Sequence, residues 1–220
     1  MRWNVRLSAV LILVAFGAAC GGNPAPEPPP VVAETQPAPD ADSLAAVMAA
    51  QREAAADRLC QEAEAAMAAG NYERARNLYR QAQTEYAGTA CANRSSDMIA
   101  RLDAIQTIRE RIHFEFDKSR ITDEAAAVLQ RKAEVLRQYP GVKLTLEGHC
   151  DERGSLEYNQ ALGQRRAESA KKYLVELGVS ADMFRTVSYG EERPVAQGSN
   201  EQAWAQNRRS EFVIENMGAF

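Results

Sequence analysis

The C-terminal half of the chain constrains the fold most, because strand-like and helix-like segments alternate there. Polar and apolar residues alternate in Arg111–Asp117 and again in Val142–His149, as in half-buried strands. Between them, a helix can begin after the capping residue Thr122 and ends before Pro140. The later elements expected are helix Ser155–Leu177, strand Arg185–Tyr189, helix Glu201–Asn207 and strand Ser210–Glu215. This βαβαβαβ order in residues 109–220 predicts a layered α/β sandwich.

Residues 1–19 have the features of a secretory signal. Arg2 and Arg6 are basic, and the thirteen residues Leu7–Ala19 are almost entirely apolar, which is shorter than the ~20 residues of a membrane span. Small residues precede Cys20, as in the lipobox of bacterial lipoproteins. That resemblance implies that Cys20 is lipid-modified and begins the mature chain. The alternative is an ordinary signal that is cleaved nearby and leaves Cys20 as a plain thiol.

Residues 20–42 contain seven of the nine prolines of the chain. Such a segment cannot bury a core and favours extended conformations, so it is predicted to be a disordered tether. Gly21 follows the cysteine where an aspartate typically retains lipoproteins at the inner membrane. The resemblance to lipoproteins therefore implies an outer-membrane anchor that faces the periplasm.

Residues 43–108 are expected to be helical throughout and to form a helical hairpin. Gly70 and Asn71 interrupt the pattern, and Ala75, Tyr79 and Ala82 then share one helix face. This segment resembles a single tetratricopeptide-type repeat, but a stable solenoid needs three or more repeats. The sequence therefore favours a spacer or an oligomerisation element over a peptide-binding superhelix.

Two cysteines are placed to close this hairpin. Cys60 lies near the start of the first expected helix and Cys91 just past the end of the second, so both would lie at the open end of the hairpin. Disulfides persist in secreted proteins, and this one would contribute roughly 3–4 kcal/mol in the chain-entropy model. The sequence predicts a Cys60–Cys91 disulfide and shows no partner for Cys150.

The composition is that of a globular protein and argues against a nucleic-acid-binding one. Hydrophobic residues make up 45% of the chain and charged residues 25%, which is ordinary for a globular protein. Acidic residues outnumber basic residues by 30 to 26, so no nucleic-acid-binding surface is expected.

Four sequence blocks occur in order in the C-terminal half: FEFDKSRI, GHCDERGSLEYNQALGQRRA, VSYGEERPV and WAQNRRSEFVI. Residues 109–216 thereby resemble the OmpA-like peptidoglycan-binding domain and, more narrowly, the peptidoglycan-associated lipoproteins of the Tol–Pal system. The resemblance implies a lipoprotein that binds peptidoglycan non-covalently and tethers the outer membrane to the cell wall. It also implies TolB as a partner that competes with peptidoglycan, and a role in envelope integrity and cell division. The helical segment 43–108 departs from the family pattern.

The second block can be analysed without the family. Asp151 lies just past a strand end, and Asn159, Leu162 and Arg166 share one face of the following helix. A carboxylate and a guanidinium would then flank one groove. Such a pair can hold a zwitterion, because the guanidinium binds a carboxylate in a bidentate fork and the carboxylate accepts an ammonium. The alternative is a structural Asp151–Arg166 ion pair that fixes the loop.

In the family, the zwitterion is diaminopimelate of the peptidoglycan stem peptide. The residues that the resemblance places around this ligand are Asp151, Arg166, Asn159 and Leu162, with backbone donors near Phe116 and Asp117.

Catalysis is not expected, and neither is a metal or a cofactor. His149, Cys150 and Glu152 are close in sequence, but adjacent strand residues point to opposite faces and do not converge on a metal. A cysteine nucleophile also needs a base and an orienting third group, and neither is evident. A peptidoglycan hydrolase is therefore disfavoured. The remaining alternative is an adaptor whose helical hairpin recruits another envelope protein, with wall binding secondary.

Overall fold

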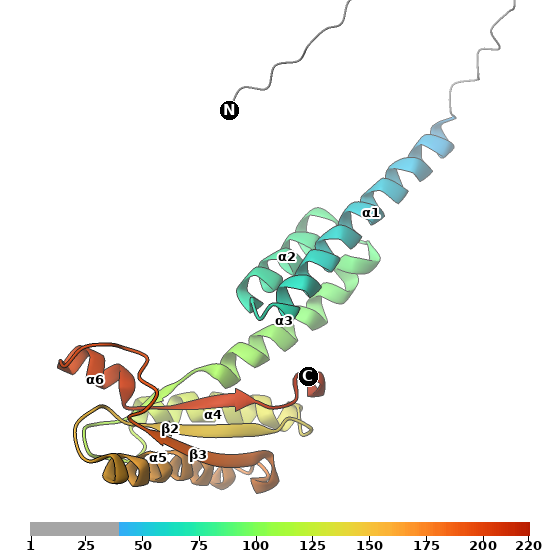
Figure 1. Ribbon diagram of the computed structural model, residues 1–220. Coiled ribbons are helices and arrows are strands. Elements are labelled where there is room, and N and C mark those ends of the chain that lie inside the picture. The colour runs from blue at the N-terminus through green and yellow to red at the C-terminus, as the bar shows by residue number, and fades with distance from the viewer. Residues whose placement is uncertain (1–39) are drawn as a thin grey trace, which may run out of the picture. The chain divides into compact units, whose positions relative to one another are not determined.

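The computed structural model describes residues 40–220, and Ala41–Phe220 form one compact unit (Figure 1). The predicted signal, the predicted lipidation at Cys20 and nearly all of the predicted tether lie outside the described residues. Within residues 40–220, no helix combines the length and the hydropathy that crossing a membrane would need.

Three helices form the N-terminal part of this unit. They are α1 (Ala41–Ala68), α2 (Tyr72–Glu85) and α3 (Ala90–Arg109). α1 and α2 form the predicted hairpin, and α3 is a third helix that the predicted two-helix hairpin did not include. The separation has a local cause: Gly88 has a φ of 91°, and the hydroxyl of Thr89 accepts the first hydrogen bond of α3 from the Ala92 N–H.

The core of this helical part is built from small residues. The face predicted from the sequence, Ala75, Tyr79 and Ala82, is buried in α2 and packs against buried alanines of α1. Asn71 caps α2, where its side chain accepts from the N–H of Arg74 at 3.1 Å. Small side chains allow these helices to approach closely, and Tyr79 is the largest side chain buried among them.

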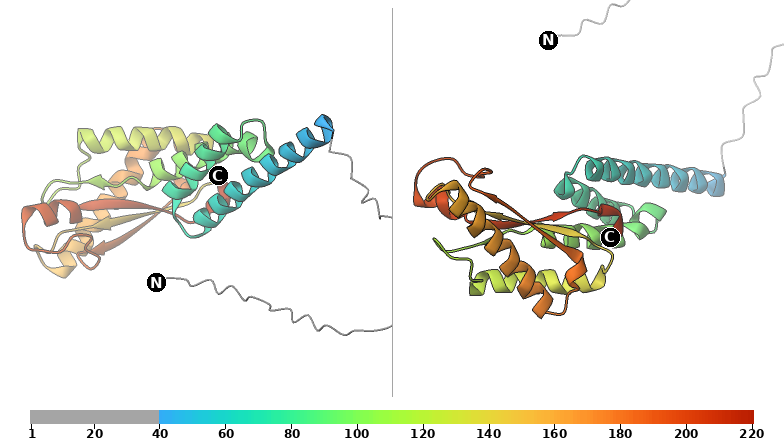
Figure 2. Two further views of the ribbon diagram at one scale, coloured as in Figure 1. Left: turned by 90° about the horizontal axis from the view of Figure 1, so that it is seen from above. Right: turned by 60° about the horizontal axis from the view of Figure 1, so that its bottom comes forward.

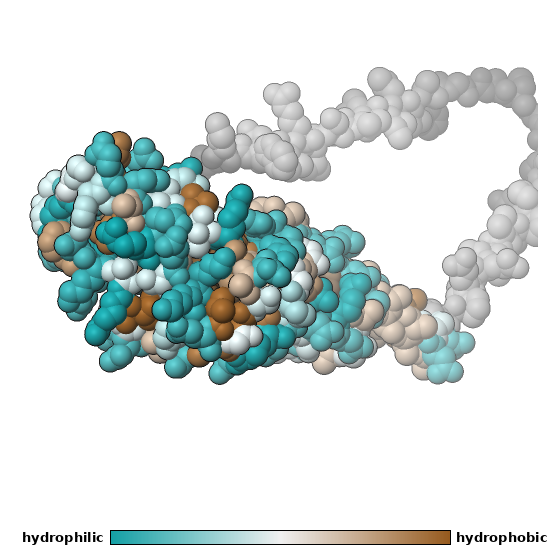
Figure 3. All heavy atoms as spheres, turned by 90° about the horizontal axis from the view of Figure 1, so that it is seen from below, coloured by the Kyte–Doolittle hydropathy of each residue, from teal (hydrophilic) through white to brown (hydrophobic). Residues whose placement is uncertain are grey.

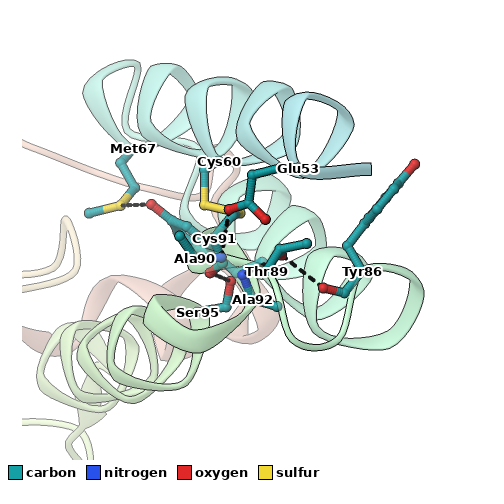
Figure 4. The surroundings of a disulfide bond; sticks show 10 residues. Glu53, Cys60, Met67, Tyr86, Thr89, Ala90, Cys91, Ala92 and Ser95 are labelled. Atoms are coloured by element: carbon teal, nitrogen blue, oxygen red, sulfur yellow. Dashed lines mark hydrogen bonds between the residues drawn. A yellow bond between two sulfur atoms is a disulfide. The ribbon is translucent and has the colours of Figure 1, made fainter. Parts of the chain in front are cut away.

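A disulfide joins Cys60 of α1 to Cys91, with 6.0 Å between the Cα atoms (Figure 4). Cys91 lies past the end of α2, as predicted, and in the first turn of α3. Cys60 was expected near the start of the first helix, but α1 begins at Ala41 and Cys60 lies in its last third. Beside it, a carboxylate oxygen of Glu53 accepts a hydrogen bond from the Ala90 N–H at 2.8 Å. A carboxylate is favourable at a helix N-terminus. The start of α3 is thus held to α1 by a covalent bond and a charged contact.

The first turns of α1 extend past the other two helices. The side chains of Leu44, Val47 and Met48 are all exposed there. Figure 3 shows this end of α1 as a mostly pale-brown segment beside the grey residues, whereas most of the visible surface is hydrophilic.

The C-terminal part is an open, mixed four-stranded sheet, which confirms the predicted α/β class. Its strands are β1 (Ile112–His113), β2 (Leu144–His149), β3 (Phe184–Gly190) and β4 (Arg209–Ile214), in the order β1-β4-β2-β3. β2 and β3 are parallel, and β4 is antiparallel to both β2 and β1. The helices are α4 (Asp123–Gln138), α5 (Leu156–Glu176) and α6 (Glu201–Asn207), with short 3-10 turns at Ala181–Met183 and Met217–Ala219. α4 and α5 lie on the same face of the sheet (Figure 2).

The first strand is shorter than predicted, and this has a consequence for the site. The pairing continues only to Phe114, whose N–H donates to the carbonyl of Arg208 at 2.9 Å. The chain then turns at Phe116 and Asp117, and Asp117 adopts a φ of 56°. A positive φ is uncommon for a residue other than glycine and often marks a functional loop. The turn carries both residues away from the sheet.

Two glycines set the distance between β2 and α5. A Cβ atom on Gly148 would overlap the carbonyl oxygen of Gly163, and one on Gly163 would overlap the hydroxyl of Ser188. Strand and helix can therefore approach this closely only without side chains at these two positions. The contact places the loop after β2 beside the first turns of α5.

Candidate functional site

A cavity of about 200 Å³ opens where β2 ends and α5 begins. Its walls come from the turn after β1, the loop after β2 and the first three turns of α5. The residues that line it are Phe116, Asp117, Cys150, Asp151, Arg153, Gly154, Tyr158, Asn159, Leu162 and Arg166. All six residues that the resemblance placed around a ligand are among them. The structure thus brings together side chains from three separate segments of the sequence.

The carboxylate of Asp151 is buried and bound to two arginines. Arg153 forms a bidentate pair with it, from Nε to Oδ1 at 3.1 Å and from Nη2 to Oδ2 at 2.7 Å. Nη1 of Arg208 donates to Oδ2 at 3.2 Å. Burial favours a higher pKa for Asp151, but the hydrogen bonds from the two arginines outweigh burial and lower the pKa. Asp151 is therefore ionised at neutral pH.

Arg166 is fully buried and does not pair with Asp151. Its guanidinium donates to the main-chain carbonyls of Lys118 at 2.9 Å, His149 at 2.7 Å and Glu115 at 3.2 Å. The structural Asp151–Arg166 ion pair considered above is therefore wrong, since the ion-pair partners of Asp151 are Arg153 and Arg208. Three of the five N–H groups of Arg166 thus donate to main-chain carbonyls, and the residue lines the cavity.

Arg153 is a site residue that the sequence analysis missed. Its guanidinium carbon lies 4.0 Å from the ring centre of Phe116 and 4.0 Å from that of Trp204 in α6. The planar guanidinium thus stacks between two aromatic rings while its edge binds Asp151. No local spacing could have shown this, because Phe116, Arg153 and Trp204 belong to three different sequence blocks.

Asn159 and Leu162 have different roles in the cavity wall. Nδ2 of Asn159 lies within hydrogen-bond distance of the carbonyls of Asp151 and Arg153, at 3.2 Å each, and of the carboxylate of Glu191. Asn159 therefore fixes the conformation of the loop after β2. Leu162 is buried and supplies an apolar part of the wall.

Cys150 forms part of the same wall. Its thiol is buried and donates to the carbonyl of Asn159 at 3.3 Å. Burial raises the pKa of Cys150 to about 11, so the thiol is protonated and a poor nucleophile at neutral pH.

Asp117 and Tyr158 meet at the rim of the cavity. The phenol of Tyr158 donates a hydrogen bond to Oδ1 of Asp117, and this bond raises the pKa of Tyr158. The contact joins the turn after β1 to α5 across the cavity mouth.

The side chain of His149, at the end of β2, does not take part in the hydrogen-bond network of the site. It is buried, neither ring nitrogen has a hydrogen-bond partner within residues 40–220, and burial lowers its pKa to about 4. Across the described part of the chain, no group of three or more His, Cys, Asp or Glu side chains is arranged to hold a metal ion.

The model of the OmpA family matches residues 113–208. A peptidoglycan-associated lipoprotein of Brucella melitensis is 42% identical over 132 residues, which cover 60% of this chain and 75% of that protein. One of Pseudomonas putida is 48% identical over 126 residues, which cover 57% of this chain and 73% of that protein. This chain belongs to the peptidoglycan-associated lipoprotein family.

Membership confirms the resemblance seen in the four sequence blocks, of which the first three lie entirely within the matched residues. The crystal structure of the peptidoglycan-associated lipoprotein from Burkholderia pseudomallei is 43% identical and covers 49% of this chain and 90% of that chain, with a TM-score of 0.47. The peptidoglycan-associated lipoproteins are envelope proteins and not a family of enzymes. The match to the OmpA model begins after α3, so it does not include the three N-terminal helices.

Proposed function

We propose that this protein is an outer-membrane lipoprotein that binds peptidoglycan non-covalently and tethers the outer membrane to the cell wall. The observation that carries the proposal is the cavity after β2, whose walls contain both the carboxylate of Asp151 and the guanidinium of Arg166. The relatives are named peptidoglycan-associated lipoproteins, and their similarity to this chain supports the same role here.

The chemistry of the cavity favours the free end of a diaminopimelate side chain as its ligand. That end carries one ammonium and one carboxylate, which match Asp151 and the guanidinium of Arg166. A volume of about 200 Å³ suits one amino-acid side chain better than a disaccharide. The stem peptide would therefore enter end-on, with the glycan strand left outside.

The anchor would be the lipid on Cys20, followed by the proline-rich tether that leads to α1. A single acyl chain binds membranes only marginally, and lipoproteins of this type carry several. Cys20→Ser should therefore release the protein into the periplasm. A Cys20→Ser protein that stays in the membrane fraction after a high-salt wash would contradict the anchor.

Sedimentation with purified sacculi tests the proposed function. The wild-type protein should co-sediment with walls whose stem peptides contain diaminopimelate. It should bind poorly to walls with lysine at that position, because lysine lacks the distal carboxylate that Arg166 would bind. Equal binding to both wall types would show that the cavity does not recognise diaminopimelate.

TolB, of the Tol system, is the proposed protein partner. Binding of TolB to this protein should compete with binding of peptidoglycan. Purified TolB should displace the protein from sacculi in proportion to its concentration. Formation of a ternary complex on the sacculus would exclude this competition.

A second candidate function is that of an adaptor, and one groove favours it. A depression of about 810 Å³ lies between α2 and the C-terminal half of α3, with Tyr72, Arg76, Asp103 and Arg109 among its lining residues. If the adaptor role dominates, Tyr72→Ala combined with Arg109→Ala should remove co-purifying envelope proteins and leave sacculus binding unchanged.

A further inference from the structure

We propose that Arg153 occupies, in the free protein, the position that the ligand's ammonium takes in the complex. Arg153 would then be a specificity-determining residue, because only a ligand with its own cation can replace it on Asp151. The inference deepens the proposed function and rests on it. It follows from the number of donors around Asp151, from their exposure and from the aromatic rings that hold Arg153.

All acceptor positions of the Asp151 carboxylate are occupied. A carboxylate offers about four lone-pair positions. Oδ1 accepts from the backbone N–H and from Nε of Arg153, at 3.1 Å each. Oδ2 accepts from Nη2 of Arg153 at 2.7 Å and from Nη1 of Arg208 at 3.2 Å. An ammonium can therefore bind Asp151 only if one of these donors leaves.

The side chain of Arg153 is the donor that can leave. Arg208 is only 8% exposed, and it also donates to the carbonyl of Phe114 at 3.0 Å and to Glu201 at 2.6 Å. The backbone N–H of Arg153 is fixed by the loop. The side chain of Arg153 is 29% exposed and lines the cavity, so a ligand can reach it from solvent.

The rings of Phe116 and Trp204 hold the guanidinium in place without burying it. Phe116 is itself 54% exposed, so one side of this stack faces solvent. A second carboxylate, that of Glu201, lies 3.7 Å from Nη1 of Arg153 and provides a partner once the contact with Asp151 breaks. An incoming ammonium then restores the charge balance at Asp151. A neutral or purely anionic ligand does not, and is rejected.

Trp204 makes the exchange measurable. The chain has two tryptophans, Trp3 and Trp204. Trp3 lies in the predicted signal, so in the mature lipoprotein, which begins at Cys20 and is purified in detergent, Trp204 is the only tryptophan. Titration with a soluble muropeptide that contains diaminopimelate should change the Trp204 emission saturably as Arg153 moves away from the indole, and calorimetry on the same samples should give the same dissociation constant.

The decisive variant is Arg153→Ala. Without the competing guanidinium, the muropeptide should bind about three- to tenfold more tightly by calorimetry. The reason is that Arg153 no longer has to leave Asp151 before the ligand ammonium can bind there. The ligand-induced change in Trp204 emission should vanish. Arg153→Lys keeps the charge but loses the planar fork, so its affinity should lie between the two. Arg185→Ala, which removes an exposed arginine of β3, is the matched control and should behave as wild type.

Two results overturn the inference while the proposed function stands. One is weaker muropeptide binding by Arg153→Ala than by wild type, which would make Arg153 a ligand contact and not a competitor. The other is an unchanged emission response in Arg153→Ala. If calorimetry detects no binding in any form of the protein, the exchange and the proposed function both fail.

Discussion

The Nζ atom of Lys132 in α4 donates a hydrogen bond to the carbonyl oxygen of Ile108, near the end of α3, at 2.6 Å. The same ammonium binds the carbonyls of Thr107 at 2.8 Å and Glu110 at 2.6 Å, and it lies 4.1 Å from the ring centre of Phe212. The last carbonyls of a helix have no partners within the helix. Lys132 supplies those partners and fixes α3 to the α/β part of the fold.

We predict that Lys132 makes stability rise with pH above neutrality. Burial lowers its pKa to about 7, whereas an unfolded lysine has a pKa near 10.5. Between these values the unfolded chain binds more protons than the folded chain, so the free energy of unfolding increases as pH rises from about 7 towards 10. Chemical denaturation at several pH values measures this trend.

Lys132→Met is the matched variant for this experiment. It keeps the length of the side chain and removes the titrating group, so the pH-dependent gain should be smaller than in wild type. It also leaves the three carbonyls without their donor, which should lower stability by about 2–4 kcal/mol. An identical pH dependence in wild type and Lys132→Met would assign the titration to another group.

The disulfide should contribute substantially to the stability of the helical part. Cys60 and Cys91 are 31 residues apart in sequence, and the chain-entropy model gives roughly 3–4 kcal/mol for such a loop. The double change Cys60→Ser with Cys91→Ser should therefore lower the denaturation midpoint of α1–α3. Sacculus binding should persist, because the cavity after β2 is formed by other elements. Loss of both together would show that the helices and the cavity unfold as one unit.

Local signals in the sequence predicted much of the fold. Thr122 caps α4 as expected, and its hydroxyl accepts a hydrogen bond from the Ala125 N–H. Ser155 was expected as the first residue of its helix and is the capping residue of α5, accepting from the Tyr158 N–H. The end of the second helix was placed correctly before Cys91, but α3 was not predicted as a separate third helix, because the helical pattern continues on both sides of Gly88 and Thr89. Capping depends on a few neighbouring residues, which is why the start of α4 at Thr122 could be recognised from the sequence.

The candidate site could be predicted only in part. Motif positions identified Asp151 and Arg166, but not which atoms each would bind. Arg166 binds main-chain carbonyls, and the position of a carbonyl depends on the whole fold. The stacking of Arg153 against Trp204 likewise depends on where α6 returns beside the loop after β2. Contacts between distant segments are set by tertiary packing, which residue spacing does not encode.

A further prediction concerns the contact between β2 and α5. In most helices, Gly→Ala stabilises by about 1 kcal/mol. At Gly163 the added methyl would overlap the hydroxyl of Ser188 and the main chain at Gly148, so Gly163→Ala should destabilise by about 1–3 kcal/mol or more. Sacculus binding should weaken as well, because α5 carries Arg166. Thermal denaturation and co-sedimentation measure the two effects.

The control for this change is Gly141→Ala. A Cβ atom at Gly141 would lie 3.6 Å from that of Ala219, an ordinary van der Waals contact, so stability should change by less than about 0.5 kcal/mol. If Gly163→Ala were as stable as Gly141→Ala, β2 and α5 would have to be less tightly packed than the structure indicates.

The last prediction concerns wall binding by the two charged groups of the cavity. Asp151→Asn keeps the shape of the side chain and removes its charge, so the ligand ammonium loses its counter-charge. Charge-assisted hydrogen bonds are worth about 1.5–3 kcal/mol each, so sacculus binding should weaken roughly ten- to a hundredfold. Asp182→Asn makes the same chemical change at an exposed position and should bind as wild type.

Arg166 needs a different variant, because its removal would also affect folding. Arg166→Ala would leave the carbonyls of Glu115, Lys118 and His149 without their donor, at a cost of about 2–4 kcal/mol in stability. Arg166→Lys keeps the charge and part of these bonds but loses the planar fork that binds a carboxylate. It should therefore retain a cooperative melting transition while it binds diaminopimelate-type sacculi poorly. If Arg166→Lys binds such walls as wild type does, Arg166 acts only on the loops around the cavity, and the ligand carboxylate must be bound by another residue.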